Sequence, residues 1–477
     1  MNDSLRSFSQ YSYMELEAKN LSAKKSRANY VSQAEFEKEY RSYLKKESGI
    51  KAVTVCFSNI EGRFHMLDYD KQHFLQSADN LTFDGSSVRG FTELAESDLR
   101  LVPDWSSLRW LPADVFGPGK VLLFASIADR EHVQYPTDFR GLLKSYSEEL
   151  YKKEKIEAFA APEIEGFLLA GVDAERNYDE KTGFSLLSTG GYYQSLPNDA
   201  LRLFIDVAAE AQRALGFENE KDHPEVAPSQ FELNFKYGSL VEIADQIQLY
   251  KLVCRQVAAQ KGMTASFLPK PLAGINGSGM HINFSLAKNG KNIFYSKKGE
   301  NSLSAQAWSS INKILNHAPE LCLIFNSSVN AYRRLDPNFE APNQIKVSPT
   351  DRGSMVRLPV GNENTTRIEV RSVAPDANPY LTLFALLKTV FSGTEFAPAI
   401  DKRPRVRFLP GTIYEALRLF KGSPFIGEIL GEGAQSKFAA WKQLAADRSP
   451  KELGSHVKTS EVIYHHEVTN QILWKLF

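Results

Sequence analysis

The chain has 477 residues, and 57 Lys+Arg against 57 Asp+Glu give it a formal net charge of +0 at pH 7. This length favours two domains over one small core. A hydrophobic fraction of 43% excludes wholesale disorder, and the balanced charge argues against a dedicated nucleic-acid-binding protein. No apolar run approaches bilayer-spanning length, and residues 1–10 hold no apolar signal core. The sequence therefore predicts a soluble, cytoplasmic protein without nucleic-acid or membrane partners.

The N-terminal part is predicted from patterning alone. Residues 1–34 are polar, mixed in charge and without sustained periodicity, which favours a flexible extension over an oligomer contact. An amphipathic pattern follows at 35–47, then strands at 52–57 and 63–69 around the turn 58–62, and a further strand at 121–127. These elements form one small domain, which we place at 35–135.

The larger domain is placed at 136–477 and opens with a helix capped by Thr137 and ending near residue 153. Further helices are predicted from Asn198 to Gly216 and over 240–261, closed by Gly262. Three scattered cysteines (Cys56, Cys254 and Cys322), each in an apolar stretch, are predicted to be buried thiols in a reducing compartment.

Four predicted strands in this domain, 158–170, 223–235, 277–286 and 367–371, combine an apolar face with a face of Glu, His and Arg. For any single strand, a half-solvated antiparallel sheet is the better explanation. Four together indicate a carboxylate-rich site, and oxygen ligands without thiolates suit Mg²⁺ or Mn²⁺. The residues are Glu163, Glu165, Glu225, Glu232, His281, Ser285, Arg367, Glu369 and Arg371.

Arginines accumulate between residues 326 and 359, at Arg333, Arg334, Arg352 and Arg357. As a charge pattern alone this is a solvated loop. Beside a carboxylate–metal sheet, arginines are what phosphoryl transfer requires, because they offset charge on the transferring group. Neither a GxxxxGK[ST] nor a GxGxxG motif follows a strand, so neither a P-loop nor a Rossmann nucleotide site is supported.

These motifs together resemble type I glutamine synthetase. The blocks are FDGSS at 83–87, PEIE at 162–165, HPEVAPSQFE at 223–232, NGSGMH at 276–281, RRLDPNFEAP at 333–342 and RIEVR at 367–371. They follow the family's order from about residue 35 to the C-terminus. The resemblance implies an α+β fold: a small N-terminal β-grasp-like domain, and a catalytic domain with a curved antiparallel sheet flanked by helices.

The resemblance also implies an ATP-dependent ligation of ammonia to the γ-carboxylate of glutamate through γ-glutamyl phosphate. Glu165, Glu225 and Glu232 would hold a first Mg²⁺ or Mn²⁺ ion, and Glu163, His281 and Glu369 a second. The implied glutamate and ammonium residues are Ser87, Tyr192, Gly277, Arg334 and Arg371. The implied nucleotide residues are Glu220, Ser285, Arg352 and Arg367.

Four residues are implied as catalytic. Asp84, presented by a neighbouring subunit, would take a proton from ammonium, and Glu340 would close a flap over the acyl phosphate. Arg352 and Arg357 would stabilise the transferring phosphoryl group. Sites would form between subunits of a dodecamer of two stacked hexamers, and the C-terminal segment HHEVTNQILWKLF either docks on another subunit or forms a buried intrachain helix.

The chain departs from the family pattern at several points. The usual NRSA reads DRGS at 351–354, and G-Q-[HN]-E reads SQFE at 229–232. Glu93 replaces a feedback-inhibition arginine, no adenylylation tyrosine is recognisable after Pro398, and Tyr414 is predicted to pack within a helix. Three alternatives remain open: a γ-glutamylamide ligase using a polyamine or other amine, a catalytically silent structural paralogue, and a guanidino kinase, which lacks this motif set.

Overall fold

The N-terminal half is built on a five-stranded sheet of order β2-β1-β5-β4-β3. The computed structural model describes residues 11–29, 31–92, 98–177, 183–335, 341–395 and 406–457, with side chains to residue 447. β1 and β5 run parallel, and the other neighbours pair antiparallel. Its strands are β1 (Ala52–Ser58), β2 (Phe64–Asp70), β3 (Leu81–Asp84), β4 (Asp98–Trp110) and β5 (Lys120–Ala128), and its helices α2 (Gln33–Lys46), α3 (Lys71–Ser77) and α4 (Ala113–Phe116).

A ten-stranded sheet forms the second half, with β13-β14-β15-β11-β6-β8-β7 as its main path and β9, β10 and β12 beside it. Only β13 and β14 run parallel among these described pairs, so the sheet is mixed rather than purely antiparallel. The strands are β6 (Ile156–Ala170), β7 (Asn219–Pro224), β8 (Gln230–Phe235), β9 (Gly238–Ser239), β10 (Met263–Ser266), β11 (Met280–Lys288), β12 (Lys291–Asn292), β13 (Gln344–Ser348), β14 (Ser354–Arg357) and β15 (Ile368–Val370).

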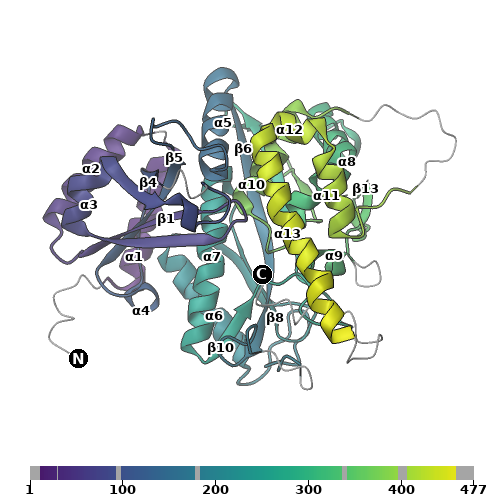
Figure 1. The fold of residues 1–477 in the computed structure, drawn as a ribbon, viewed down its shortest axis with the longest axis horizontal. Coiled ribbons are helices and arrows are strands. Elements are labelled where there is room, and N and C mark those ends of the chain that lie inside the picture. Colours follow the sequence, from purple (N-terminus) through teal and green to yellow (C-terminus); the bar gives the residue numbers. More distant parts are fainter. Residues whose placement is uncertain are drawn as a thin grey trace.

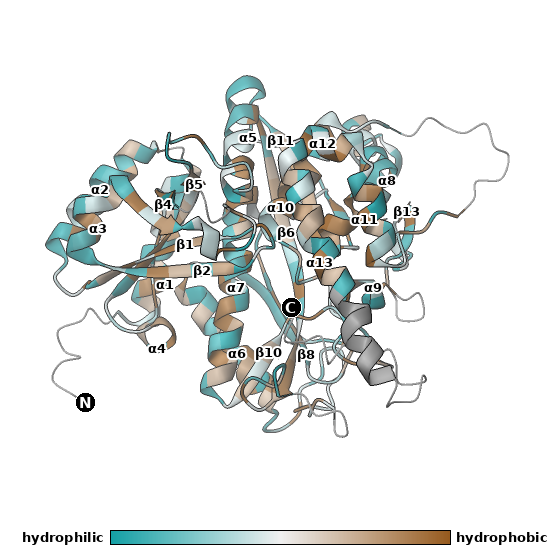
Figure 2. Ribbon diagram, viewed as in Figure 1, coloured by the Kyte–Doolittle hydropathy of each residue, from teal (hydrophilic) through white to brown (hydrophobic). Residues whose placement is uncertain are grey.

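Helices pack around this sheet and enclose one large apolar core (Figure 1). Hydrophilic residues lie on the outer faces of the helices and at the outer end of α5 (Figure 2). No helix among the described residues is long and apolar enough to cross a membrane. The helices are α5 (Phe139–Glu154), α6 (Ala200–Ala214), α7 (Leu240–Gln260), α8 (Ala305–Phe325), α9 (Ala331–Arg334), α10 (Pro379–Ser392), α11 (Ile413–Lys421), α12 (Pro424–Leu430) and α13 (Glu432–Val457).

Most predicted elements are confirmed with small shifts of their ends. The hairpin of β1 and β2 forms as predicted, with Phe57 opposite His65. The helix cap at residue 137 is wrong: Asp138 accepts the Gly141 N–H, while the Thr137 hydroxyl donates to the Gly90 carbonyl. The predicted strand 223–235 is two strands, β7 and β8, and β4 has no counterpart among the predicted elements. The three cysteines are free and buried, as predicted.

The expectation of a flexible extension is wrong for residues 13–28, which form helix α1 (Tyr13–Ala28). A capping box starts it, with Ser12 and Glu15 satisfying each other's backbone N–H groups. Leu16 and Ala23 are buried, although the weakly amphipathic sequence gave no sign of this face. The domain boundaries at 35 and 136 remain predictions. The ordered chain begins upstream of residue 35, because α1 packs against the rest of the protein.

Asn20 joins α1 to strand β4 of the first sheet and to helix α6. Its side-chain amide donates to the carbonyls of Trp110 in β4 and Ala214 in α6, at 2.9 and 2.8 Å, and its oxygen accepts the Trp110 N–H at 3.0 Å. The backbone at Gly216 lies close to Asn20, and a Cβ added at Gly216 would lie only 2.8 Å from the Cβ of Asn20. The helix thus ties the first sheet to α6.

We expect Asn20→Ala to lower the free energy of unfolding by about 2 to 4 kcal/mol, because it leaves buried backbone groups without partners. Met14→Ala is the matched control, since Met14 in the same helix is 82% exposed and should change stability by less than about 0.5 kcal/mol. Denaturant unfolding measures both. Equal, small losses would contradict the docking of α1.

Candidate active site

The register of three neighbouring strands brings a first group of metal-ligating side chains together. His281 on β11 lies opposite Glu163 on β6, and Glu369 on β15 lies opposite Asn283, two residues from His281 on the same face. His281 Nδ1 lies 3.4 Å from Glu163 Oε2 and 3.7 Å from Glu369 Oε1. Since strand residues two apart share a face, the predicted set of Glu163, His281 and Glu369 converges.

A second group lies on β7 and β8. His223 is opposite Glu232 in the register, and Glu225 follows two residues later. The His223 ring nitrogens lie 3.6 Å from Glu225 Oε1 and 3.6 Å from Glu232 Oε1. Glu225 and Glu232 were predicted as metal ligands, whereas His223 was not. The alternation of His223 and Glu225 was the available signal, hidden by the intervening proline.

Glu165 lies between the two groups. It pairs with Glu232 in the register of β6 and β8, and its Oε2 accepts the Gly279 N–H at 2.7 Å. Glu165 was predicted as a ligand together with Glu225 and Glu232. In the structure, the residues whose ligand atoms lie close together are His223, Glu225 and Glu232, so His223 takes the place of Glu165. Glu165 nevertheless faces the same cavity.

Burial and mutual repulsion keep several of these carboxyl groups from ionising easily. Burial raises the pKa of Glu165 to about 7, and burial together with Glu165 raises that of Glu225 to about 7. The pKa of Glu232 rises well above its ordinary value for the same reasons. Burial also opposes ionisation of Glu163, but His281 outweighs it, with help from Asn283, and lowers its pKa to about 2. The raised pKa values show that the carboxylates of the site lack enough positive charge around them, so a cation would stabilise their ionised forms.

The donor sets fit divalent cations. They consist of carboxylate oxygens and imidazole nitrogens without thiolate, which suits Mg²⁺ or Mn²⁺. Within the described part of the chain, His223 Nε2 is buried without a hydrogen-bond partner. An unsatisfied buried nitrogen of this kind is rare, and a bound cation would satisfy it.

Three arginines approach these carboxylates. Arg371 Nη1 donates to Glu369 Oε1 at 2.6 Å, and Arg357 pairs with the other oxygen of Glu369, which is fully buried. Arg334 Nη2 donates to the Arg371 carbonyl at 2.9 Å. Arg334 Nη1 and the Nε atoms of Arg357 and Arg371 have no hydrogen-bond partner among the described residues. These donors remain for an anionic ligand.

A cavity of about 420 Å³ contains most of the predicted residues. Its volume is that of an ordinary small-molecule site. Lys221, Gln230 and Asn276 also line it and were missed. The predicted residues among its walls are Glu163, Glu165, Tyr192, Glu225, Glu232, Gly277, His281, Arg334, Arg352, Arg357 and Arg371.

Three predicted nucleotide residues, Glu220, Ser285 and Arg367, do not line the cavity. Arg367 Nε donates to Asn283 Oδ1 at 2.9 Å, and Asn283 donates to Glu163 Oε1 at 3.0 Å, so Arg367 is linked to a candidate ligand through one amide. Ser285 follows Asn283 on the same face of β11, and Glu220 is an exposed residue of β7.

Asp84 and Ser87 do not line this cavity. Asp84 ends β3, the edge strand of the first sheet, and its exposed carboxylate accepts hydrogen bonds from the hydroxyls of Ser86 at 2.6 Å and Ser87 at 2.5 Å. These hydrogen bonds lower the pKa of Asp84 below its ordinary value. Asp84 was expected to act in the site of a neighbouring subunit, and Ser87 to bind glutamate or ammonium. Glu340, Glu93, residues 396–405 and the C-terminal segment lie outside the described residues.

Two departures from the family pattern have a local explanation. Ser229 replaces a glycine in the SQFE block and adopts φ 57°, a conformation that favours glycine. Its hydroxyl accepts the backbone N–H groups of Leu187 and Ser188 at 2.7 and 2.8 Å, which offsets the strain and secures the loop next to Tyr192. In the DRGS block, Asp351 accepts the Gly353 N–H at 2.8 Å and pairs with Lys346 at 2.6 Å.

Comparisons with known proteins agree with this geometry. The family described as glutamine synthetase, catalytic domain matches residues 136–456, and the glutamine synthetase β-grasp domain matches residues 49–130. The chain belongs to the glutamine synthetase family. Its members are ATP-dependent ligases that use divalent metal ions, and this chain is an enzyme of that class. The predicted α+β fold with an N-terminal β-grasp unit is confirmed.

Individual relatives cover most of the chain. The glutamine synthetase of Thermus thermophilus is 35% identical, over 84% of this chain and 93% of the relative, and that of Methanosarcina mazei is 34% identical, over 84% and 92%. Among solved structures, the Plasmodium falciparum glutamine synthetase has a TM-score of 0.79 at 20% identity, covering 92% of this chain and 98% of that one. A protein named GmaS has a TM-score of 0.75 at 25% identity, covering 87% and 98%.

We expect Mg²⁺ or Mn²⁺ to raise the melting temperature more at about pH 8 than at about pH 5.5. Without metal, Glu165 and Glu225 have pKa values raised to about 7, so stability is lost as the pH rises through 7, and a bound cation removes this penalty. Thermal unfolding with and without metal checks this. Glu225→Gln should diminish the gain, and a gain equal at both pH values would contradict the assignment.

Proposed function

We propose that this enzyme ligates ammonia to the γ-carboxylate of L-glutamate, using ATP and forming γ-glutamyl phosphate as the intermediate. The observation that carries the proposal is one cavity in which two carboxylate–histidine groups meet three arginines with unused donors. Carboxyl activation by ATP needs both parts, because divalent cations would supply positive charge to the phosphate oxygens and the arginines would offset charge on the transferring phosphoryl group.

The arginines divide into two roles. Arg334 and Arg371 would bind the carboxylates of glutamate. The Gly277 backbone lies next to Arg334, since a Cβ added at Gly277 would lie 3.2 Å from the Arg334 Cγ. Arg352 and Arg357 would stabilise the phosphoryl group, while Glu220, Ser285 and Arg367 would contact the nucleotide. The cations, Mg²⁺ or Mn²⁺, would supply Lewis-acid polarisation of the phosphate oxygens.

Water must be kept from γ-glutamyl phosphate, because an acyl phosphate hydrolyses readily. We assign this task to the flap that carries Glu340, as the family resemblance implies. Tyr192 lines the cavity beside the second metal group, with its ring 5.6 Å from that of His223, and would border the ammonium site. A closed, dry site also strengthens every charge interaction within it.

Asp84 would complete the site from a second copy of the chain. An exposed aspartate is ionised at neutral pH, so Asp84 would attract ammonium and accept its proton as the nitrogen attacks. Its position on an exposed edge strand, outside the cavity of its own chain, supports a shared site. We therefore propose a homo-oligomer, a dodecamer of two stacked hexamers, acting in the cytoplasm.

A second candidate is a γ-glutamylamide ligase that uses a polyamine or another amine. The similarity to GmaS at a TM-score of 0.75 keeps this candidate open. Both reactions share the phosphorylation of glutamate and differ only in the nucleophile, so the arginines and metal ligands do not separate them. A catalytically silent paralogue would require no such concentration of buried charge.

The nucleophile is tested by measuring phosphate release from ATP with Mg²⁺ and glutamate, with ammonium and separately with methylamine, ethanolamine and putrescine. We expect ammonium to be preferred by at least about 100-fold in kcat/KM, since a site for a small cation excludes larger amines. Preference for an amine would establish the second candidate. Absence of release with every nucleophile would contradict both.

The shared site is tested with Asp84→Asn and Arg357→Gln. Each variant alone should lose at least about 100-fold in kcat, because each removes a charge needed in the reaction. Co-assembled in equal amounts, they should regain activity in about a quarter of the sites, where Asp84 from one chain meets Arg357 from the other. Mixtures that stay inactive, although mass spectrometry shows mixed oligomers, would contradict sharing.

A further inference from the structure

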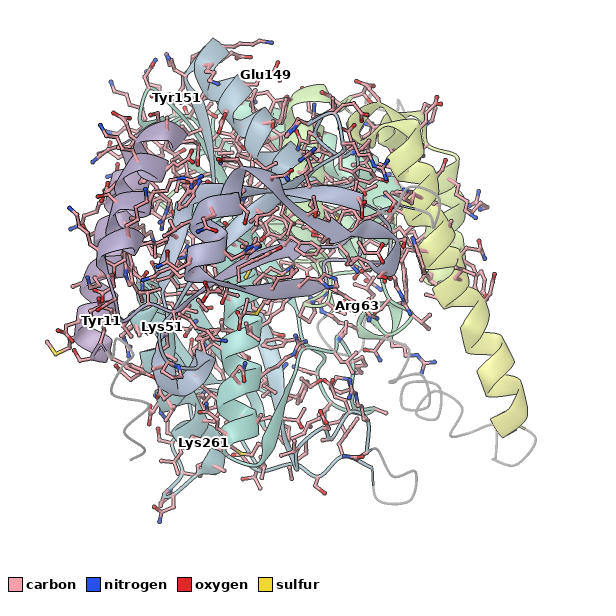
Figure 3. The ribbon with its side chains drawn as sticks, turned by 60° about the vertical axis from the view of Figure 1, so that its left-hand side comes forward. Tyr11, Lys51, Arg63, Glu149, Tyr151 and Lys261 are labelled. Carbon is pink, nitrogen blue, oxygen red and sulfur yellow. The ribbon has the colours of Figure 1, made fainter. Side chains whose placement is uncertain are left out.

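A second cavity, of about 620 Å³, lies between the turn that joins β1 to β2, helix α7 and helix α13. It shares none of its lining residues with the candidate active site. Arg63, at the end of the hairpin, lies on the side of the first sheet that faces the second half of the chain (Figure 3). The cavity has the size of an ordinary ligand site.

The lining of this cavity is predominantly basic. Three acidic side chains, Glu61, Glu175 and Asp376, face six basic ones. Glu61 is already engaged, with its Oε1 2.9 Å from Lys442 Nζ and its Oε2 3.7 Å from Arg89. The basic residues are Arg63, Arg89, Arg176, Lys251, Arg255 and Lys442.

Lys251 is the most informative of these residues. It is only 7% exposed, lines the cavity from α7, and makes no hydrogen bond or ion pair within the described part of the chain. Burial, with the nearby Arg255, lowers the pKa of Lys251 to about 7, against the opposing charge of Asp376. An amine at a cavity wall, without an acceptor among the described residues, can donate hydrogen bonds to a ligand in that cavity.

The rest of the lining is apolar and aromatic. Phe267, Leu268 and Trp441 contribute to the walls. The Arg255 guanidinium lies 5.4 Å from the centre of the Phe267 ring, and that of Arg89 lies 5.5 Å from Trp441. Guanidinium groups held over aromatic rings leave their N–H edges available to a carboxylate or a phosphate.

We propose that this cavity binds a small organic anion, with a carboxylate or phosphate group held by Lys251 and Arg255 and an apolar body against Phe267 and Trp441. The hydroxyl-bearing segment Ser327–Ser328 borders the same space and supplies further donors. A carboxylate and a phosphate both present several acceptor oxygens, which the lysine and arginine side chains of this cavity can bind.

The anion site adjoins the active site through the chain itself. Ser327 and Ser328 precede α9, which carries Arg334, and Asp376 follows Arg371 by five residues. The charge of Asp376 acts on both Lys251 and Arg334. An anion beside Lys251 would therefore alter the electrostatic surroundings of Arg334, which makes the cavity an effector site; this step rests on the proposed function.

Calorimetric titration of the full chain with phenyl phosphate, and separately with phenylsuccinate, tests the binding. We expect saturable binding of at least one probe at one site per chain, and the two titrations distinguish a phosphate from a carboxylate ligand. Arg255→Gln and Lys251→Met should each weaken binding at least about fivefold, by removing a charged hydrogen-bond donor. Arg255 is exposed, so its substitution leaves the core intact if Lys251→Met fails to fold.

Two control variants separate the possible outcomes. Lys261→Gln removes the same charge at the far end of α7, away from the cavity (Figure 3), and should leave binding unchanged. Arg357→Gln, in the active site, should also leave binding unchanged. No saturable binding, equal affinity in all variants, or loss only in Arg357→Gln would overturn the proposal, the last by locating the probe in the active site.

The effector role has its own measurement. Saturating probe should change the KM for glutamate at least about twofold in the wild-type enzyme and leave it unchanged in Arg255→Gln. Binding by calorimetry with an unchanged KM would overturn the effector role, while an enzyme inactive under all conditions would contradict the proposed function and leave the binding result standing.

Discussion

The need to hold several carboxylates in one buried cavity is the constraint on which the rest of this structure depends. Carboxylates a few ångströms apart repel one another, and burial removes the water that would screen them. The raised pKa values of Glu165, Glu225 and Glu232 express this cost directly. Arginines relieve part of it at Glu369, and the remainder leaves a site that favours cations.

A mixed sheet meets this constraint because its register is rigid. His281 faces Glu163, and His223 and Glu165 face Glu232, across strands whose other faces are packed in the apolar core. A one-residue slip would move every ligand to the apolar side, so packing and ligand placement support the same register. Strand pairing therefore positions the carboxylates and histidines, while the segments between strands supply Tyr192 and Arg352 to the same cavity.

The two halves of the chain are joined by buried polar contacts as well as by apolar packing. Arg140 of α5 donates to Asp245 of α7 at 2.8 Å and to Asp104 of β4 at 2.9 Å, and Tyr380 of α10 donates to Asp245 at 2.7 Å. Such buried ion pairs resist separation, since removing one partner would leave the other charges buried without a counter-charge. The first sheet, with Asp84 at its edge, is thus held in a definite place relative to the catalytic sheet.

Much of the site could be predicted from the sequence. Alternation along single strands placed Glu163, His281 and Glu369 on polar faces, because side-chain direction in a strand depends only on residue parity. His223 was missed because proline and a strand break separate it from Glu232, which contacts it only through the pairing of β7 with β8. Helix α1 was missed because its weak amphipathicity conceals Leu16 and Asn20, whose burial depends on distant partners.

The sequence by itself determined which strands carry the carboxylates of the active site and where arginines accumulate. It also determined which family the motifs resemble. Only the tertiary structure decided which carboxylate lies beside which histidine, which arginine donors stay unused, and that a second cavity exists whose lining is basic and includes Lys251. The physical reason is that local patterning sets the face of a side chain, whereas burial, pKa and cavity shape arise from segments far apart in the chain.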